Sequence, residues 1–75
     1  MSLLIDNEAV LELEQHIHER VGGRVRNLRV FRREGQLVVE GCSHSFYAKQ
    51  LATHAVFEFG PSEELVNDIV VDRQA

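Results

Sequence analysis

The segment "AKQLATHAVFEFGP", residues 48–61, decides how this chain folds. Its apolar side chains recur at the i, i+3, i+4, i+7, i+8, i+11 spacing of a helix with one buried side. These residues are Ala48, Leu51, Ala52, Ala55, Val56 and Phe59. Gly60-Pro61 ends the helix, because proline disfavours helical backbone in the residue before it. The segment therefore predicts an amphipathic helix whose alanines allow it to lie close to a sheet.

The stretches on either side of this helix have the composition of strands. Residues 36–40, "QLVVE", precede it, and residues 65–72, "LVNDIVVD", follow it and alternate around Val66, Ile69 and Val71. Strand, helix and strand in this order predict a right-handed crossover that leaves the two strands parallel.

Two more elements come before this unit. A period of two from Val25 to Arg32 predicts a strand that turns back through a hairpin loop at residues 33–35, with Gly35 as the left-handed residue. Apolar residues at helical spacing predict a first helix from about Asp6 to Val21, with Asp6 as its N-cap.

The order of elements predicts the fold class. Seventy-five residues suffice for one domain, here residues 1–75 with a core at about 6–72. We expect an α+β fold, an αββαβ sandwich with a three-stranded mixed sheet and two helices on one face. The other face of the sheet is then uncovered, and on it we expect apolar residues ringed by charge, a pattern typical of a partner surface or dimer contact. These residues are Arg29, Phe31, Val38, Glu40 and Val70.

The composition limits the function further. Apolar residues make up 44% of the chain and charged residues 27%, which is typical of a globular protein. The single cysteine cannot form a disulfide within the chain, so we expect folding without a disulfide, metal or cofactor. The chain has no apolar run of membrane-spanning length and no leader segment, which predicts a cytoplasmic protein and leaves peripheral membrane association open.

The charges are unevenly distributed along the chain. The net charge is -4, yet six of the eight basic residues fall between positions 20 and 33. They are Arg20, Arg24, Arg26, Arg29, Arg32 and Arg33. The segregation indicates either a basic stripe for an anionic partner or arginines that pair with glutamates on neighbouring elements.

The chain resembles the BON family, a small bacterial module with the same order of elements. The resemblance rests on "NLRV" with the following "GQLVVEG", the helix "YAKQLATHAV" and the closing "LVNDIVV". The positions that match the family pattern are Gly41, Ala48, Ala55, Val66, Asn67 and Ile69. The resemblance implies attachment or phospholipid binding without enzymatic activity. The segment "CSHSFYAK" is richer in reactive and aromatic groups than the family's usual polar segment.

Three kinds of site can be compared with ordinary structural roles. Cys42, His44 and His54 could be metal ligands, but about ten residues of helix separate the two histidines by roughly 15 Å. Cys42 beside His44 is a thiol near a base, yet no pocket or oxyanion hole accompanies them. The nucleic-acid module called KH needs a GXXG loop between two helices, and Gly22-Gly23 leads into a strand instead. We therefore expect no enzyme, metal, small-molecule substrate or nucleic acid, and the roles of Cys42 and His44 stay open.

We expect an interaction module that binds a protein partner or itself, as a homo-oligomer such as a dimer. Binding to an anionic phospholipid surface is the alternative, and KH-like nucleic-acid binding is a second alternative. The candidate surface combines two groups of side chains, one on the uncovered sheet face and one at the start of the second helix. They are Arg29, Phe31, Val38 and Val70, and Phe46, Tyr47 and Lys49.

Overall fold

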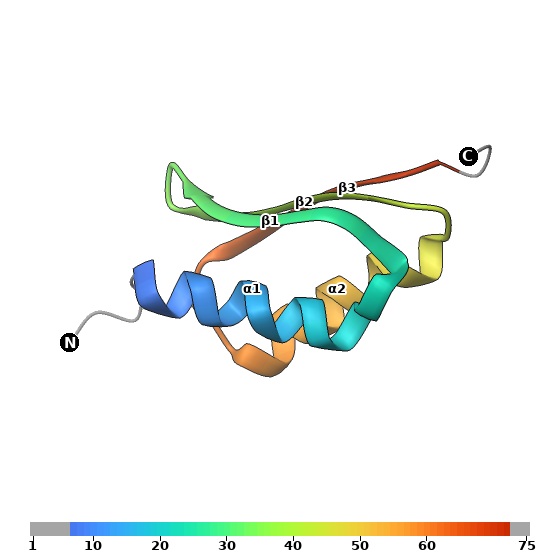
Figure 1. The fold of residues 1–75 in the computed structure, drawn as a ribbon. Coiled ribbons are helices and arrows are strands. Elements are labelled where there is room, and N and C mark those ends of the chain that lie inside the picture. The colour runs from blue at the N-terminus through green and yellow to red at the C-terminus, as the bar shows by residue number, and fades with distance from the viewer. Residues whose placement is uncertain (1–6, 73–75) are drawn as a thin grey trace.

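The computed structural model describes residues 7–72 and contains the expected order of elements. The elements are α1 (Asn7–Val21), the short 3₁₀ turn η1 (Gly22–Arg24), β1 (Val25–Arg33), β2 (Gln36–Ser43), α2 (Phe46–Phe59) and β3 (Glu64–Val71). The strands form one sheet in the order β1-β2-β3, in which β1 pairs antiparallel with β2 and β2 pairs parallel with β3. Both helices lie against the same side of the sheet, and no helix of residues 7–72 covers the other side (Figure 1). The predicted α+β fold is confirmed.

The core lies between the helices and the sheet. From α1 it takes Leu13, Ile17 and Val21, which are fully buried on one side of the helix. From α2 it takes the three predicted alanines and Val56, and the sheet contributes Leu37, Val39 and Ile69. Because alanine is small, α2 can lie close to the sheet at the crossover. Truncating a buried side chain such as Leu13 to alanine would cost about 2–5 kcal/mol.

The ends of α2 are set by its own sequence. The hydroxyl of Ser45 accepts a hydrogen bond from the amide of Ala48 at 3.2 Å, so Ser45 is the N-cap. Gly60 ends the helix in the left-handed conformation with φ of 77°. The predicted N-cap of α1, Asp6, lies outside the described residues.

The second strand is longer than its apolar run predicts. We expected it to end at Glu40, but it continues through Gly41 and Cys42 to Ser43. These last residues pair in register with Ile69 to Val71 of β3, and on the other side Cys42 and Ser43 pair with Arg26 and Val25. The pairing register with β1 shifts between Arg26 and Arg29, so that one extra residue on β1 forms a β-bulge. Asn27 in this bulge has φ of 58°, a left-handed conformation that asparagine tolerates better than most residues.

The hairpin between β1 and β2 is tighter than expected. Arg33 is already paired with Gln36, so the loop contains Glu34 and Gly35 alone. Both have positive φ, 52° and 79°, as in a type I′ turn. The left-handed conformation of Gly35 is confirmed, and Glu34 shares it although glutamate has no preference for it.

Each outer strand has an amide bonded to a side chain. On β1 the amide of Val30 donates to the carboxylate of Glu14 on α1 at 2.9 Å. On β3 the amide of Ile69 donates to the side-chain oxygen of Asn67 at 3.1 Å. Because each of these amides donates to a side chain and each strand has β2 on its other side, the two amides lie on the free edges of the sheet. The side-chain nitrogen of Asn67 also donates to the carbonyl of Lys49 and the hydroxyl of Thr53, which ties β3 to α2.

Candidate functional site

The sheet face away from the helices, called the open face below, is formed by alternate residues of all three strands. β1 contributes Arg26, Arg29, Phe31 and Arg33; β2 contributes Gln36, Val38, Glu40 and Cys42; β3 contributes Glu64, Val66, Asp68 and Val70. The predicted positions Arg29, Phe31, Val38 and Val70 are thus brought together on one face. We expected the last strand to alternate around Val66, Ile69 and Val71, but Val66 lies on the open face. The segment "LVNDIVV" has apolar residues on both sides of the strand, and Leu65, not Val66, packs against the core.

The charges on the open face are separated by strand. The arginines Arg26, Arg29 and Arg33 lie on β1, and the acidic residues Glu64 and Asp68 lie on β3. On the middle strand, Glu40 adds a third carboxylate. One edge of the open face is therefore basic and the other acidic.

Two guanidinium groups lie on the Phe31 ring. The Cζ atoms of Arg29 and Arg33 are 5.7 and 5.5 Å from the ring centroid, within the range of cation–π attraction. The guanidinium of Arg33 also reaches Asp68 at 4.0 Å, across the middle strand. Both partners are more than half exposed, so this ion pair stabilises the fold by no more than about 1 kcal/mol.

The exposure of the open face differs from our expectation at one residue. Val38 lies beside Phe31, as predicted, but its exposed fraction is 0%. It is flanked by Phe31 and Val66 on the adjacent strands, and the Arg33 side chain spans the sheet above this row. Val38 can therefore be reached only if these neighbours move. Val70, by contrast, is 61% exposed.

A shallow groove of about 390 Å³ occupies one end of the open face. It is lined by residues from all three strands, namely Asn27, Arg29, Glu40, Gly41, Cys42, Asp68 and Val70. Its lining carries opposite charges at the two edges of the sheet, Arg29 on β1 and Asp68 on β3. The groove is open and shallow, which suits contact with a second surface better than enclosure of a small molecule.

Cys42 and His44 have separate structural roles. Cys42 belongs to the open face, where its sulfur lies 3.9 Å from a guanidinium nitrogen of Arg26. His44 follows the end of β2, and its Nδ1 is 2.9 Å from the carbonyl oxygen of Asp72, which lies just after β3. Since the carbonyl of Ser43 also accepts a hydrogen bond from the amide of Asp72 at 2.7 Å, His44 belongs to the junction that holds the end of β3.

The start of α2 presents the second group of predicted residues. Phe46 and Tyr47 are exposed, whereas Lys49 is half-buried. Phe57, three turns further along α2, is 68% exposed and lies on the same side of the helix as Phe46. The aromatic ridge, defined as Phe46, Tyr47 and Phe57, therefore lies on the helix layer of the molecule, away from the open face.

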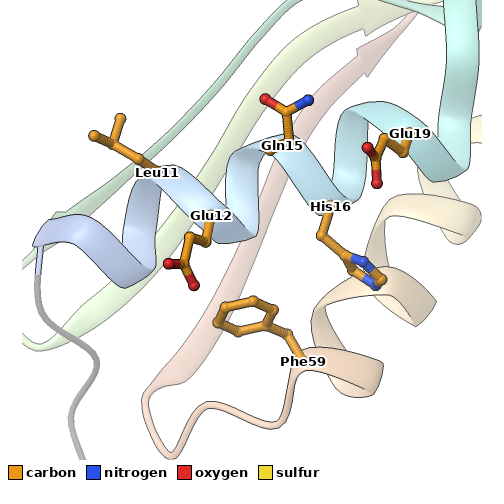
Figure 2. A pocket seen from close by; sticks show the side chains of 6 residues that line it. All are labelled: Leu11, Glu12, Gln15, His16, Glu19 and Phe59. Carbon is orange, nitrogen blue, oxygen red and sulfur yellow. The ribbon is translucent and has the colours of Figure 1, made fainter.

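A second groove, of about 500 Å³, lies between α1 and the end of α2. Its lining residues are Leu11, Glu12, Gln15, His16, Glu19 and Phe59, and Figure 2 shows Glu12 and His16 directed toward Phe59. The His16 ring lies 6.1 Å from that of Phe59, and its Nε2 is 3.2 Å from the carboxylate of Glu58. Sequence reasoning missed this groove, because it depends on how the two helices meet.

The remaining arginines are held by acidic side chains or backbone. Arg20 donates to Glu58 at 2.7 Å. Arg32 donates to Glu63 through Nε and a terminal nitrogen at 3.1 and 2.8 Å, and the Glu63 side chain is buried. Of the two readings of the arginine-rich segment, pairing with neighbouring glutamates is correct for Arg20 and Arg32. Arg26, Arg29 and Arg33, by contrast, form a basic column along β1 on the open face.

Two further findings concern metals and membranes. Among the residues that the structure describes, no three side chains of the types His, Cys, Asp or Glu are grouped to hold a metal ion. The described helices lack the length and apolar content needed to cross a membrane.

Comparison with known proteins gives no relative. A scan of protein-family models, a search of curated proteins and a search of solved structures each return no match. The resemblance to the BON family therefore stays a prediction.

Proposed function

We propose that this chain is a non-enzymatic interaction module of the cytoplasm, BON-like in kind, that associates with a second copy of itself through the open face. The observation that carries the proposal is the separation of charge on that face, with arginines on β1 and carboxylates on β3. A surface with positive charges in one column and negative charges in another is complementary to a copy of itself. This matters because the net charge of -4 would otherwise repel a second copy.

The size of the open face predicts how strong the association is. Strands of eight residues at about 3.3 Å per residue, three abreast at about 4.8 Å, present roughly 400 Å². A stable interface buries about 800 Å² on each partner, so this contact belongs to the weak and transient class. We therefore expect a dissociation constant in the micromolar range or above, and a dimer that dissociates on dilution.

The proposal is tested by measuring mass against concentration, by sedimentation equilibrium from about 10 µM to 1 mM, around the weak affinities expected. The matched variants are Phe31→Ala on the open face and Phe57→Ala on α2, which remove the same side chain from opposite layers. Phe31→Ala should raise the dissociation constant about tenfold, as for an aromatic residue near an interface centre, and Phe57→Ala should leave it unchanged. A chain that stays monomeric at every concentration would refute self-association.

A second candidate function is binding to an anionic phospholipid surface, and the aromatic ridge on α2 favours it. Phe46, Tyr47 and Phe57 are each exposed on α2, and aromatic side chains of this kind insert at the headgroup level of a bilayer. Lys49 on the same helix supplies a positive charge.

Vesicle flotation separates the two candidates with the same pair of variants. Lipid binding predicts that the chain floats with vesicles of phosphatidylserine and phosphatidylcholine but not with phosphatidylcholine alone. It also predicts that Phe57→Ala weakens flotation and that Phe31→Ala does not. The absence of flotation with both vesicle types would exclude the lipid function and leave self-association unaffected.

A further inference from the structure

The charge layout of the open face repeats in two rows across the sheet. In each row an arginine on β1 and a carboxylate on β3 lie on either side of a β2 residue. The rows are Arg29–Glu40–Asp68 and Arg33–Gln36–Glu64. Because strands are evenly spaced, the arginine and the carboxylate of each row are equally far from β2. The open face is therefore opposite in charge on the two sides of a line along β2.

Symmetry allows two simple ways to bring this face against itself. Two copies in isologous contact are related by a two-fold axis, and for a face-to-face contact of sheets that axis lies in the plane between them. An axis perpendicular to the strands would place β1 over β1, with arginines against arginines. An axis along β2 places β1 of one copy over β3 of the other, with arginines against carboxylates.

We propose that two copies pair face to face about a two-fold axis along β2, so that Arg29 of each copy meets Asp68 of the other and Arg33 meets Glu64. This geometry rests on the proposed function, since it specifies how the open face associates. It leaves the strands of the two sheets nearly aligned, which is one of the two usual arrangements of packed sheets. It also brings Phe31 of each copy against Val66 of the other, because these residues occupy the two ends of one row.

The ion pair between Arg33 and Asp68 of one chain does not prevent the proposed pairing between two copies. Arg33 reaches Asp68 of its own chain at 4.0 Å, but both side chains are more than half exposed. A pair of this kind is weak and is easily exchanged for a partner that also removes water from the site. Arg29 has a cation–π contact with Phe31, which the dimer retains.

Exchange of charge between two variants tests the axis directly. Arg29→Asp and Asp68→Arg are exposed substitutions, so neither should disturb the fold. Each variant alone would place like charges together twice and should raise the dissociation constant at least tenfold. In an equimolar mixture, Asp at position 29 meets Arg at position 68, and Asp68 meets Arg29. The mixture should therefore form a heterodimer at least as tight as the dimer of the unaltered chain.

The outcomes separate the geometry from the proposed function. A dimer of the unaltered chain that neither single variant weakens would overturn the axis along β2 while self-association stands. Two weakened variants whose mixture is no tighter would likewise overturn it. Failure of the unaltered chain to dimerise at any concentration would remove both proposals.

The single cysteine provides a second, independent measurement. Cys42 lies on β2, so the two Cys42 residues of the dimer lie near the axis at the spacing of packed sheets, about 10 Å. A disulfide needs Cα atoms about 4.4–6.8 Å apart, so a short bismaleimide rather than an oxidant is the suitable cross-linker. The chain should yield covalent dimer in high proportion. A variant that carries Cys42→Ser and Gln50→Cys, with its thiol on the outer side of α2, should not, and equal yields from both would contradict the geometry.

Discussion

Gly41 lies at a position of the sheet that has no room for a side chain. A Cβ atom at this position would lie 2.6 Å from Cγ1 of Val25 and 3.1 Å from the carbonyl oxygen of Arg26. Both contacts come from the strand that carries the β-bulge, so the extra residue on β1 takes the room that a side chain on β2 would need. Gly41, the last residue of "GQLVVEG", is thus glycine for a physical reason.

We predict that Gly41→Ala destabilises the fold by about 2 kcal/mol, because overpacking a close contact forces the backbone to shift. Urea denaturation followed by circular dichroism measures the change. Gly23→Ala is the matched control, since a Cβ atom there would have open space for 4 Å around it among the described residues. It should change the unfolding free energy by less than about 0.5 kcal/mol. Equal effects of the two substitutions would show that the bulge does not crowd β2.

Glu34 has a backbone conformation that is unfavourable for glutamate. Its φ of 52° lies in the region that asparagine and glycine adopt more readily than glutamate. We predict that Glu34→Asn stabilises the fold by about 0.5–1 kcal/mol, since Asn-Gly is a preferred type I′ pair. Glu34→Ala, which keeps a Cβ without the preference, should give no gain. Thermal unfolding of the two variants makes the comparison, and a stabilising alanine would point to the charge rather than the turn.

At the scale of elements, Asn67 connects a strand to a helix. Its side chain makes three hydrogen bonds, to the Lys49 carbonyl at 2.9 Å, the Thr53 hydroxyl at 2.8 Å and the Ile69 amide at 3.1 Å. These bonds fix the position of α2 along β3 at the end of the crossover. Asn67 thus has a structural role, because its side chain holds β3 against α2.

We predict that Asn67→Ala destabilises the fold by about 2–3 kcal/mol, because three bonds are lost and their partners stay partly buried. The adjacent Asp68→Ala, on the open face, should change the unfolding free energy by less than about 0.5 kcal/mol. Hydrogen exchange should also speed up at the Ile69 amide in Asn67→Ala alone. Unchanged exchange there would mean that the bond to Ile69 contributes little protection.

The elements themselves were predictable, and the details of their faces were not. The buried alanines of residues 48–61 and the Gly60-Pro61 stop define α2 because they act locally. The extension of β2 beyond Glu40 was missed because Gly41, Cys42 and Ser43 follow the apolar run and are held in the strand by pairing with β1 and β3. Apolar residues at both parities of β3 left the direction of Val66 ambiguous. Val38 is buried because it lies on the central strand and because the Arg33 side chain from β1 passes above it. Neither cause can be recognised from the residues next to Val38 in the sequence.

At the scale of the whole molecule, the two layers have different surfaces. The helix layer presents the aromatic ridge and the groove between α1 and α2, whereas the open face presents separated charges around apolar residues that range from the buried Val38 to the exposed Val70. The candidate site was predictable as a face, since alternation places Arg29, Phe31 and Val70 together. Its acidic half was not, because the pairing of Asp68 with the row of Arg29 depends on the parallel register of β3.

The middle strand allows a prediction about the assembled pair. In the proposed dimer the two Glu40 side chains approach each other near the axis, and like charges placed opposite each other are unfavourable. We predict that Glu40→Gln tightens the dimer severalfold and that Gln36→Glu, which adds a second pair of like charges near the axis, weakens it. Sedimentation equilibrium at low ionic strength measures both, and raised salt should reduce both differences. A weaker dimer for Glu40→Gln and a tighter dimer for Gln36→Glu would show that the axis does not lie along β2.

The hydrogen bonds of Glu14 and Asn67 to the edge strands bear on how far assembly can extend. A strand can be added to a sheet only where a run of edge amides and carbonyls is free, and an unprotected edge is the usual starting point of fibres. Here each border of the sheet has an amide near its middle already bonded to a side chain of the same chain. Sideways growth is disfavoured at both borders, while the open face is occupied by a single copy. The proposed dimer should therefore not extend into fibres by addition of strands at its sheet edges.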